Sequence, residues 1–158
     1  MDEFDELDLP VTFIDDQGRE SDDPVQGVPV VTLQVMPLDL ANPAKQVDAA
    51  SVRCLIDTGG DYVYVADKVI SALKAPLAPE PNTIKINGTS DRTVHTVALA
   101  SPDDRWAHPF RAVSLPLGEM HQHVGVVLGR AFLVNCRLHF DGPNKAFTLT
   151  LPKAGVSS

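Results

Sequence analysis

Val52-Arg53-Cys54-Leu55-Ile56-Asp57-Thr58-Gly59-Gly60 carries an apolar run directly into a turn made of an aspartate, a threonine and two glycines. An ionised carboxylate at the end of a buried strand costs free energy unless hydrogen bonds or charges satisfy it. Because glycine lacks a Cβ, the turn can bring backbone N–H groups close to the Asp57 oxygens. The segment therefore predicts a strand that ends in a polar loop built around Asp57.

The rest of the chain has the pattern of an all-β protein. Short β-branched runs alternate with Gly, Pro, Asn and Asp, and 13 prolines leave little room for long helices. One or two short helices are expected, over residues 67–73 and 129–133. These features favour a single-domain barrel or sandwich. The predicted strands are residues 11–14, 28–35, 51–57, 62–65, 83–87, 93–99, 111–115, 124–128, 136–140 and 147–151.

Acidic residues are concentrated at the start of the chain. The net charge is −8, and residues 1–23 hold ten of the 21 acidic residues, with Arg19 as their single base. We interpret residues 1–23 as a mobile acidic arm and residues 24–158 as the folded domain. Nucleic-acid binding lacks a basic surface. Because no apolar run approaches the ~20 residues that cross a bilayer and no secretory signal is visible, we expect no membrane partner and a cytoplasmic location.

The cysteines and histidines form no recognisable redox or metal motif. Cys54 and Cys136 each fall in an apolar run, which favours buried, reduced thiols over a disulfide. An alternative is a metal site on His121 and His123, whose alternation along a strand would point both imidazoles to one face. No third ligand follows at a recognisable spacing. We therefore expect neither a metal nor another cofactor.

Two segments together resemble a known family. Leu55-Ile56-Asp57-Thr58-Gly59-Gly60-Asp61 resembles the hydrophobic-hydrophobic-Asp-Thr-Gly-Ala-Asp motif of retroviral and retropepsin-like aspartic proteases. Val126-Val127-Leu128-Gly129-Arg130 resembles the apolar-apolar-Gly-Arg segment that follows it in the family. The resemblance spans residues 28–151, with specific matches near 52–65 and 126–133. It implies an all-β, retropepsin-like acid-protease barrel that closes as a homodimer.

The resemblance also implies roles for the residues around Asp57. Asp57 would be the catalytic carboxylate, and Thr58, Gly59 and Gly60 would form the active-site loop. Thr58 would reach across the two-fold axis to the partner's loop, and the Gly59 backbone would contact carboxylate or substrate. Gly60 departs from the usual Ala or Ser, and Ala131 stands where the family commonly has Asp or Asn.

The second segment would support this loop from behind. Asp61 and Arg130 occupy positions that form an ion pair in the retroviral enzymes, so we expect the same pair here. Breaking such a pair is costly where it is partly buried. Val127, Leu128 and Gly129 are expected to pack behind the active-site loop.

A flap is expected between the two segments. Ile84-Lys85-Ile86-Asn87-Gly88-Thr89-Ser90 alternates apolar and polar residues and then presents Asn-Gly, a strong hairpin signal. We assign the flap to Ile86, Asn87 and Gly88, with its tip at the last two. An ordinary surface hairpin would have the same sequence pattern, so the assignment depends on position between the motifs.

Catalysis of the implied kind needs a second copy of the chain. The family hydrolyses peptide bonds with two carboxylates that share one proton around a water. The Asp-Thr-Gly motif occurs once here, so a symmetric homodimer must supply the second Asp57. The substrate would be an extended polypeptide. Terminal strands build the dimer in the retroviral relatives, which makes residues 147–151 and 11–14 candidates for an intermolecular sheet.

A function of another class stays open. Folds of this kind are reused as catalytically silent dimerisation or peptide-binding modules. Retention of Asp57, Thr58 and Gly59 together argues for the enzyme.

Overall fold

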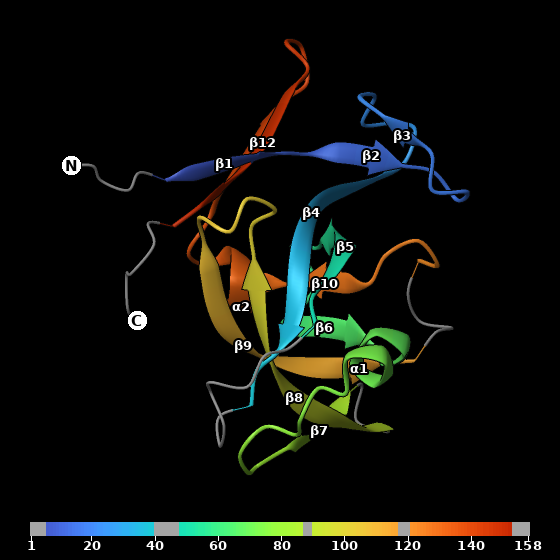
Figure 1. Cartoon of the computed structure of the whole chain (residues 1–158). Helices are drawn as coiled ribbons and strands as arrows, with labels where there is room; N and C mark the ends of the chain where they lie inside the picture. The colour runs from blue at the N-terminus through green and yellow to red at the C-terminus, as the bar shows by residue number, and fades with distance from the viewer. Residues whose placement is uncertain (1–5, 40–47, 87–89, 117–120, 153–158) are drawn as a thin grey trace, which may run out of the picture.

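The computed structural model describes residues 6–39, 48–86, 90–116 and 121–152 and is mostly β-structure (Figure 1). Its two short helices are α1 (Asp67–Leu73) and α2 (Arg130–Leu133). Its strands are β1 (Leu7–Pro10), β2 (Thr12–Ile14), β3 (Glu20–Ser21), β4 (Val28–Pro37), β5 (Ala50–Ile56), β6 (Val63–Ala66), β7 (Thr83–Ile86), β8 (Ser90–Ala100), β9 (Ala107–Leu115), β10 (Val126–Leu128), β11 (Arg137–Asp141) and β12 (Ala146–Leu151).

The described strands form two sheets. The larger sheet has the order β3-β2-β4-β5-β10-β6-β9-β8-β7, and an additional pairing between β4 and β8 closes six of its strands into a barrel. The smaller sheet has the order β1-β12-β11. The prediction of an all-β barrel with two short helices is confirmed, and α1 has the predicted bounds.

The first strands correct the expectation of a mobile arm. β1 pairs antiparallel with β12, and β2 pairs antiparallel with β4, so this segment joins the two sheets along the top of Figure 1. Phe13 is buried and meets the ring of Phe147 edge-on, with 5.1 Å between the ring centroids. Residues 7–14 therefore belong to the packed structure, whereas the division of the chain at residue 23 stays a prediction.

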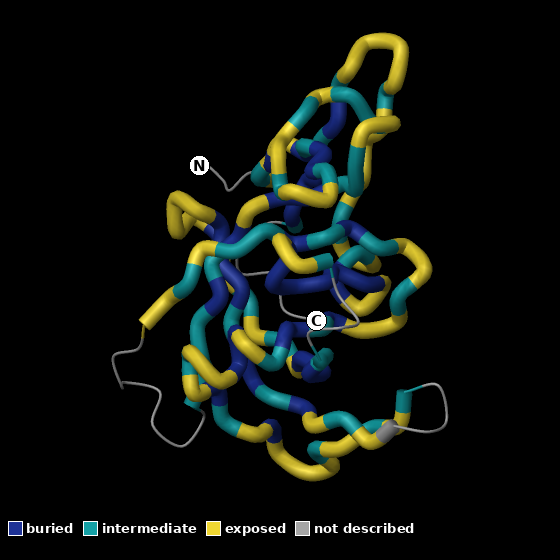
Figure 2. Tube along the Cα trace, turned by 90° about the vertical axis from the view of Figure 1, so that its right-hand side faces the viewer, coloured by how far each residue is buried: buried dark blue, intermediate teal, exposed yellow. Residues whose placement is uncertain are grey.

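The core lies inside the barrel and continues under the smaller sheet, as the burial colours of Figure 2 show. Alternation along β4 places Val31, Leu33 and Val35 inside. Trp106 contacts Phe132 of α2 edge-on at 5.8 Å, which fixes α2 against the barrel. Phe132 is itself 2% exposed, so α2 is anchored by a buried aromatic side chain.

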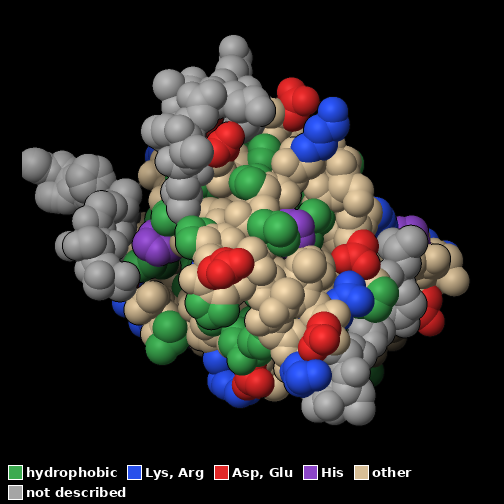
Figure 3. Space-filling model, turned by 90° about the horizontal axis from the view of Figure 1, so that it is seen from below, with side chains coloured by type: hydrophobic (Ala, Val, Ile, Leu, Met, Phe, Trp, Pro, Cys, Tyr) green, Lys and Arg blue, Asp and Glu red, His purple; other side chains and the backbone are tan. Residues whose placement is uncertain are grey.

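The charged surface and the lengths of the helices both concern possible partners. Basic and acidic side chains lie interspersed on the described part of the face seen in Figure 3. Across the described residues, none of the helices is long and apolar enough to span a membrane.

Candidate active site

Asp57 directly follows β5, beside a strand from the second motif. β10 lies between β5 and β6, parallel to β5 and antiparallel to β6. Because β5 and β6 follow each other in the chain but are separated in the sheet by β10, the loop that joins them must cross the end of β10. This topology places the Asp57 loop against Leu128 and Gly129 at the end of β10. These are residues that we expected to pack behind the loop.

Backbone hydrogen bonds fix Asp57 and its carboxylate. The Asp57 N–H donates to the Leu128 carbonyl at 3.1 Å, and the Gly59 N–H donates to Asp57 Oδ1 at 2.9 Å. The Gly60 N–H donates to the Asp57 carbonyl at 3.2 Å, which closes the turn. Asp57 is half-buried, whereas Thr58 and Gly59 are exposed. The carboxylate is thus oriented by the loop at a surface that stays accessible.

Gly60 lies where two side chains converge. A Cβ at Gly60 would lie 3.3 Å from Asp57 Oδ2 and 3.4 Å from Cε2 of Tyr64. A Cβ at Gly59 would likewise lie 3.3 Å from Asp57 Oδ1. Both distances are tight but not impossible, so an alanine at either position requires small shifts of its neighbours. The ring of Tyr64 therefore lies beside the loop that carries Asp57.

Behind the Asp57 loop, Gly129 has no space for a side chain. A Cβ there would lie 2.3 Å from the Tyr62 carbonyl oxygen and 2.8 Å from that of Gly60. The Gly129 N–H donates to Tyr62 at 3.0 Å, and the Arg130 N–H donates to Gly60 at 2.8 Å. Val127 and Leu128 are buried, so an apolar strand supports the loop from below and its glycine end bonds the loop directly.

The Arg130 side chain supports the loop from the outside. Its guanidinium forms an ion pair with Asp61 and donates from Nη1 to the Thr58 carbonyl at 2.9 Å. The side chains of Arg130 and Asp61 are 56% and 63% exposed. An exposed ion pair contributes little to global stability, about 0–1 kcal/mol. Its effect is therefore local, because Arg130 joins Thr58 and Asp61 on either side of the two glycines.

The structure describes only the base of the expected flap. β7 ends at Ile86 and pairs antiparallel with β8, so the two strands form a hairpin. Asn87 and Gly88, the expected tip, lie outside the described residues. Ile84, Ile86 and Tyr64 pack against one small cluster formed by Ala78, Val94 and Val113. The hairpin is thus in the same cluster as the tyrosine beside Asp57.

Sequence reasoning missed Tyr62 and Tyr64. Their rings meet edge-on at 6.0 Å, and Tyr62 is 38% exposed. Tyr62 directly precedes β6 and Tyr64 lies within it, at a spacing of two that points side chains to one face of an extended segment. This alternation was visible in the sequence, but the neighbours of that face depend on the pairing of distant strands.

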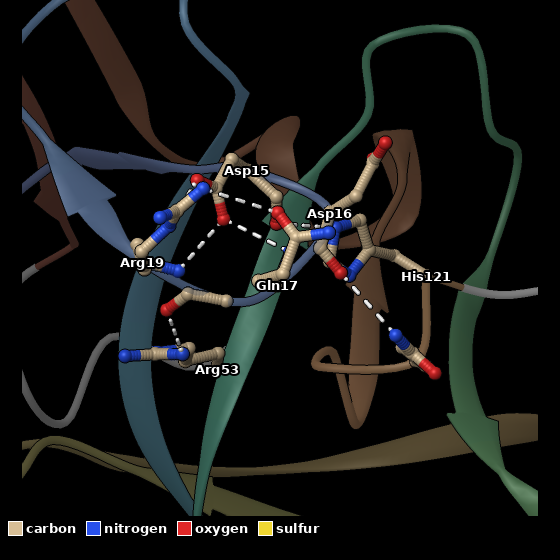
Figure 4. Close-up of polar contacts among 8 residues, drawn as sticks. Asp15, Asp16, Gln17, Arg19, Arg53 and His121 are labelled. Atoms are coloured by element: carbon tan, nitrogen blue, oxygen red, sulfur yellow. Dashed lines mark hydrogen bonds and ion pairs between the residues drawn. The ribbon is translucent and has the colours of Figure 1, made fainter.

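The histidines of the metal hypothesis make backbone contacts. Figure 4 shows His121 beside the turn at residues 15–19, where its Nε2 lies 3.0 Å from the Asp15 carbonyl oxygen. His121 Nδ1 accepts the N–H of His123 at 3.1 Å. Within the part of the chain that the structure describes, no three His, Cys, Asp or Glu side chains gather as a metal site.

Neither thiol is paired in a disulfide. Cys54 is buried and Cys136 is partly buried. Burial raises the pKa of Cys54, and it raises the pKa of Cys136 to about 12. Both side chains are therefore protonated near neutral pH and are poor nucleophiles.

The fold is that of retropepsin-like proteins. The chain is similar to a crystal structure of a retropepsin-like aspartic protease from Rickettsia conorii, with a TM-score of 0.51 and 10% sequence identity. The similarity covers 96% of this chain and 97% of that chain. No protein-family model and no curated protein matches the sequence. At this identity the likeness defines the fold, and the reaction has to be argued from the residues.

Proposed function

We propose that this protein is a homodimeric aspartic endopeptidase in which each subunit supplies one Asp57. The observation that carries the proposal is the hydrogen bond from the Gly59 N–H to Asp57 Oδ1, in a loop anchored on Leu128. This arrangement presents an oriented carboxylate at an accessible surface. A lone carboxylate of this kind lacks the acid that peptide hydrolysis also requires.

The second Asp57 would supply that acid. Two like charges about 3 Å apart cannot both ionise easily, so the pair holds one proton between them. The ionised Asp57 would take a proton from a bound water while the water oxygen attacks the scissile carbonyl carbon, and the protonated Asp57 would give its proton to the carbonyl oxygen, which yields a gem-diol. As the C–N bond breaks, the amine would take a proton from one Asp57 and a diol hydroxyl would return a proton to the other, so that the pair again shares one proton. Gly59 and Arg130 would keep the carboxylate in place throughout.

The proposed substrate is an extended polypeptide segment. Extended peptides bind by strand-like backbone pairing, with pockets for alternate side chains. The β7–β8 hairpin and the ring of Tyr64 pack against one apolar cluster, so the hairpin lies on the Tyr64 side of the Asp57 loop, where the proposed substrate would bind. Closure of that hairpin would exclude water from the reacting atoms.

A subunit-mixing experiment tests the proposal. The parent protein is mixed with a tenfold excess of Asp57→Asn, and cleavage of a fluorogenic peptide is measured after subunit exchange. Activity is expected to fall by about tenfold, because random exchange leaves few dimers with two Asp57 carboxylates. An equal excess of Asp103→Asn, altered in a turn outside the loop, should add activity.

Two outcomes would contradict the proposal in different ways. Unchanged activity after complete exchange would mean that one chain suffices for cleavage. Absence of cleavage by a folded, dimeric parent on a broad peptide mixture would favour the silent peptide-binding module.

A further inference from the structure

Among the described strands, the smaller sheet has two edge strands, β1 and β11, and β11 carries exposed apolar side chains. β12 lies between β1 and β11, so both of its edges are paired within the chain. This arrangement removes β12 from the intermolecular pairing that the resemblance implied. β11 has no second neighbouring strand among the described residues. An unpaired edge presents a row of backbone donors and acceptors that can pair with another chain.

Exposed apolar side chains accompany this edge. Val134 is 75% exposed, Leu138 is 43% exposed and Phe140 is 57% exposed. The β11–β12 hairpin projects from the body at the top of Figure 1, and its tip is exposed in Figure 2. Natural edge strands are usually protected by charges, proline or bulges. β11 has charged residues only at its two ends, Arg137 and Asp141, and the exposed Leu138 and Phe140 between them mark an interaction site.

Val134, which precedes β11 in the chain, lies close to the residue that holds the Asp57 loop. Arg130 bonds the Thr58 carbonyl and begins α2, and the Val134 N–H donates to the Arg130 carbonyl at 2.9 Å. Val134 therefore lies one helical turn from the residue that braces the Asp57 loop. A two-fold axis that brings two Asp57 loops together also brings together the surfaces beside them. The first candidate for such a surface is the stretch from Val134 through β11.

The sequence of β11 is complementary to itself. A strand that pairs with its own copy across a two-fold axis runs antiparallel to it. With His139 at the centre, Leu138 lies opposite the partner's Phe140, and Arg137 lies opposite the partner's Asp141. Apolar pairs and opposite charges are the favourable cross-strand combinations. Arg137 pairs with Glu6 in its own chain but keeps 68% of its side chain exposed.

We propose that β11 of two copies pairs antiparallel about His139, which continues the smaller sheet across the dimer. The occupant of the edge is a second copy of this chain, because the proposed active site is incomplete without one. This inference rests on the proposed function, because the dimer is needed to bring two Asp57 carboxylates together. Its geometry can be tested without any measurement of cleavage.

The direct test is a disulfide across the axis. Residues directly opposite in an antiparallel pair have Cα atoms about 4.5–5.5 Å apart, which suits a disulfide. His139→Cys is made together with Asp57→Asn, to prevent self-cleavage, and with Cys136→Ser. The matched control places Thr83→Cys on β7, an exposed position on another edge strand, in the same background. Disulfide-linked dimer should form at least about tenfold faster for His139→Cys.

A second variant tests the interface through the dissociation constant of the dimer, without the use of cysteines. Leu138→Glu places a carboxylate opposite the partner's Phe140, and sedimentation should show a dimer dissociation constant raised by about tenfold or more. Val25→Glu is the control, because Val25 is also apolar and 86% exposed but lies in the loop between β3 and β4 of the larger sheet. Circular dichroism verifies that each variant keeps its β-structure.

The outcomes separate this inference from the proposed function. If the parent is a dimer but His139→Cys crosslinks no faster than Thr83→Cys, the β11 interface is wrong and the enzyme proposal stands. If His139→Cys crosslinks while the parent cleaves no peptide, the interface stands and the enzyme proposal fails. A parent that stays monomeric at all concentrations overturns both.

Discussion

The backbone N–H of Asp57 donates to the carbonyl of Leu128, with 3.1 Å between nitrogen and oxygen. This bond extends the pairing of β5 with β10 by one residue into the active-site loop. Leu128 is fully buried, so the start of the loop is tied to the core of the barrel. The position of the Asp57 carboxylate therefore depends on the packing behind it.

Gly129→Ala should disrupt the loop and destabilise the fold. The new Cβ would meet the carbonyl oxygens of Tyr62 and Gly60, which are backbone atoms that cannot move independently. Overpacking of this kind costs about 1–3 kcal/mol in the free energy of unfolding. Urea denaturation measures this loss. Gly142→Ala is the control, since nothing lies within 4 Å of a Cβ there, and an equal loss in both variants would contradict the argument.

Arg130→Lys should lower activity much more than stability. The ion pair with Asp61 is exposed, so its loss changes the free energy of unfolding by about 1 kcal/mol or less. Lysine keeps the charge but cannot bond Asp61 and the Thr58 carbonyl together as the guanidinium does. We expect kcat to fall by about tenfold, as misplaced catalytic groups do. Arg105→Lys serves as control, because Arg105 also forms an exposed ion pair, with Asp103. Similar kcat values for both variants would count against the bracing role.

Tyr62→Ala should change which peptides are cleaved. Tyr62 is partly exposed and contacts Tyr64, whose ring lies beside the Asp57 loop. If these rings contact the bound peptide, removing one changes which side chains are preferred near the scissile bond. We expect the ratio of kcat/KM between preferred and disfavoured peptides to change by about tenfold. Cleavage-site profiling of a peptide library measures the change. An unchanged profile at reduced overall activity would assign Tyr62 a structural role only.

Acid should release a contact in the turn at residues 101–106. Hydrogen bonds from the Arg105 side chain, then from Ser101 and the Arg105 backbone, lower the pKa of Asp103 from 3.8 to about 2. A lowered carboxylate pKa stabilises the folded turn above pH ~4, and this contribution is lost as the pH falls towards 2. Carbon-13 NMR titration should give a midpoint near 2. In Arg105→Gln the midpoint should rise; an unmoved midpoint would exclude Arg105 as the main cause.

Local patterns predicted much of the fold and part of the candidate site. Asp61 and Arg130 were matched by position in two short motifs, and their ion pair is present. The strands that were predicted are rich in β-branched residues, and α1 begins with Asp67, which suits a helix N-terminus. These features depend on the residues within a few positions of each other.

Features that depend on distant pairing were not predicted. Leu7 and Leu9 alternate as in a strand, but the surrounding acidic residues suggested a solvated arm. β1 becomes a strand because β12 pairs with it and Leu9 is buried against the core. The edge position of β11 and the neighbours of Tyr64 follow from the same long-range pairings, which local sequence does not encode.

The most direct test of the central claim compares the parent with Asp57→Asn on a mixture of unstructured peptides, read by mass spectrometry. Sedimentation and circular dichroism establish that both proteins keep the same fold and assembly. We expect cleavage by the parent and none by Asp57→Asn, because no carboxylate pair remains to activate water. Equal cleavage by the two proteins, or cleavage by neither, would contradict the assignment of Asp57 as the catalytic residue of an aspartic endopeptidase.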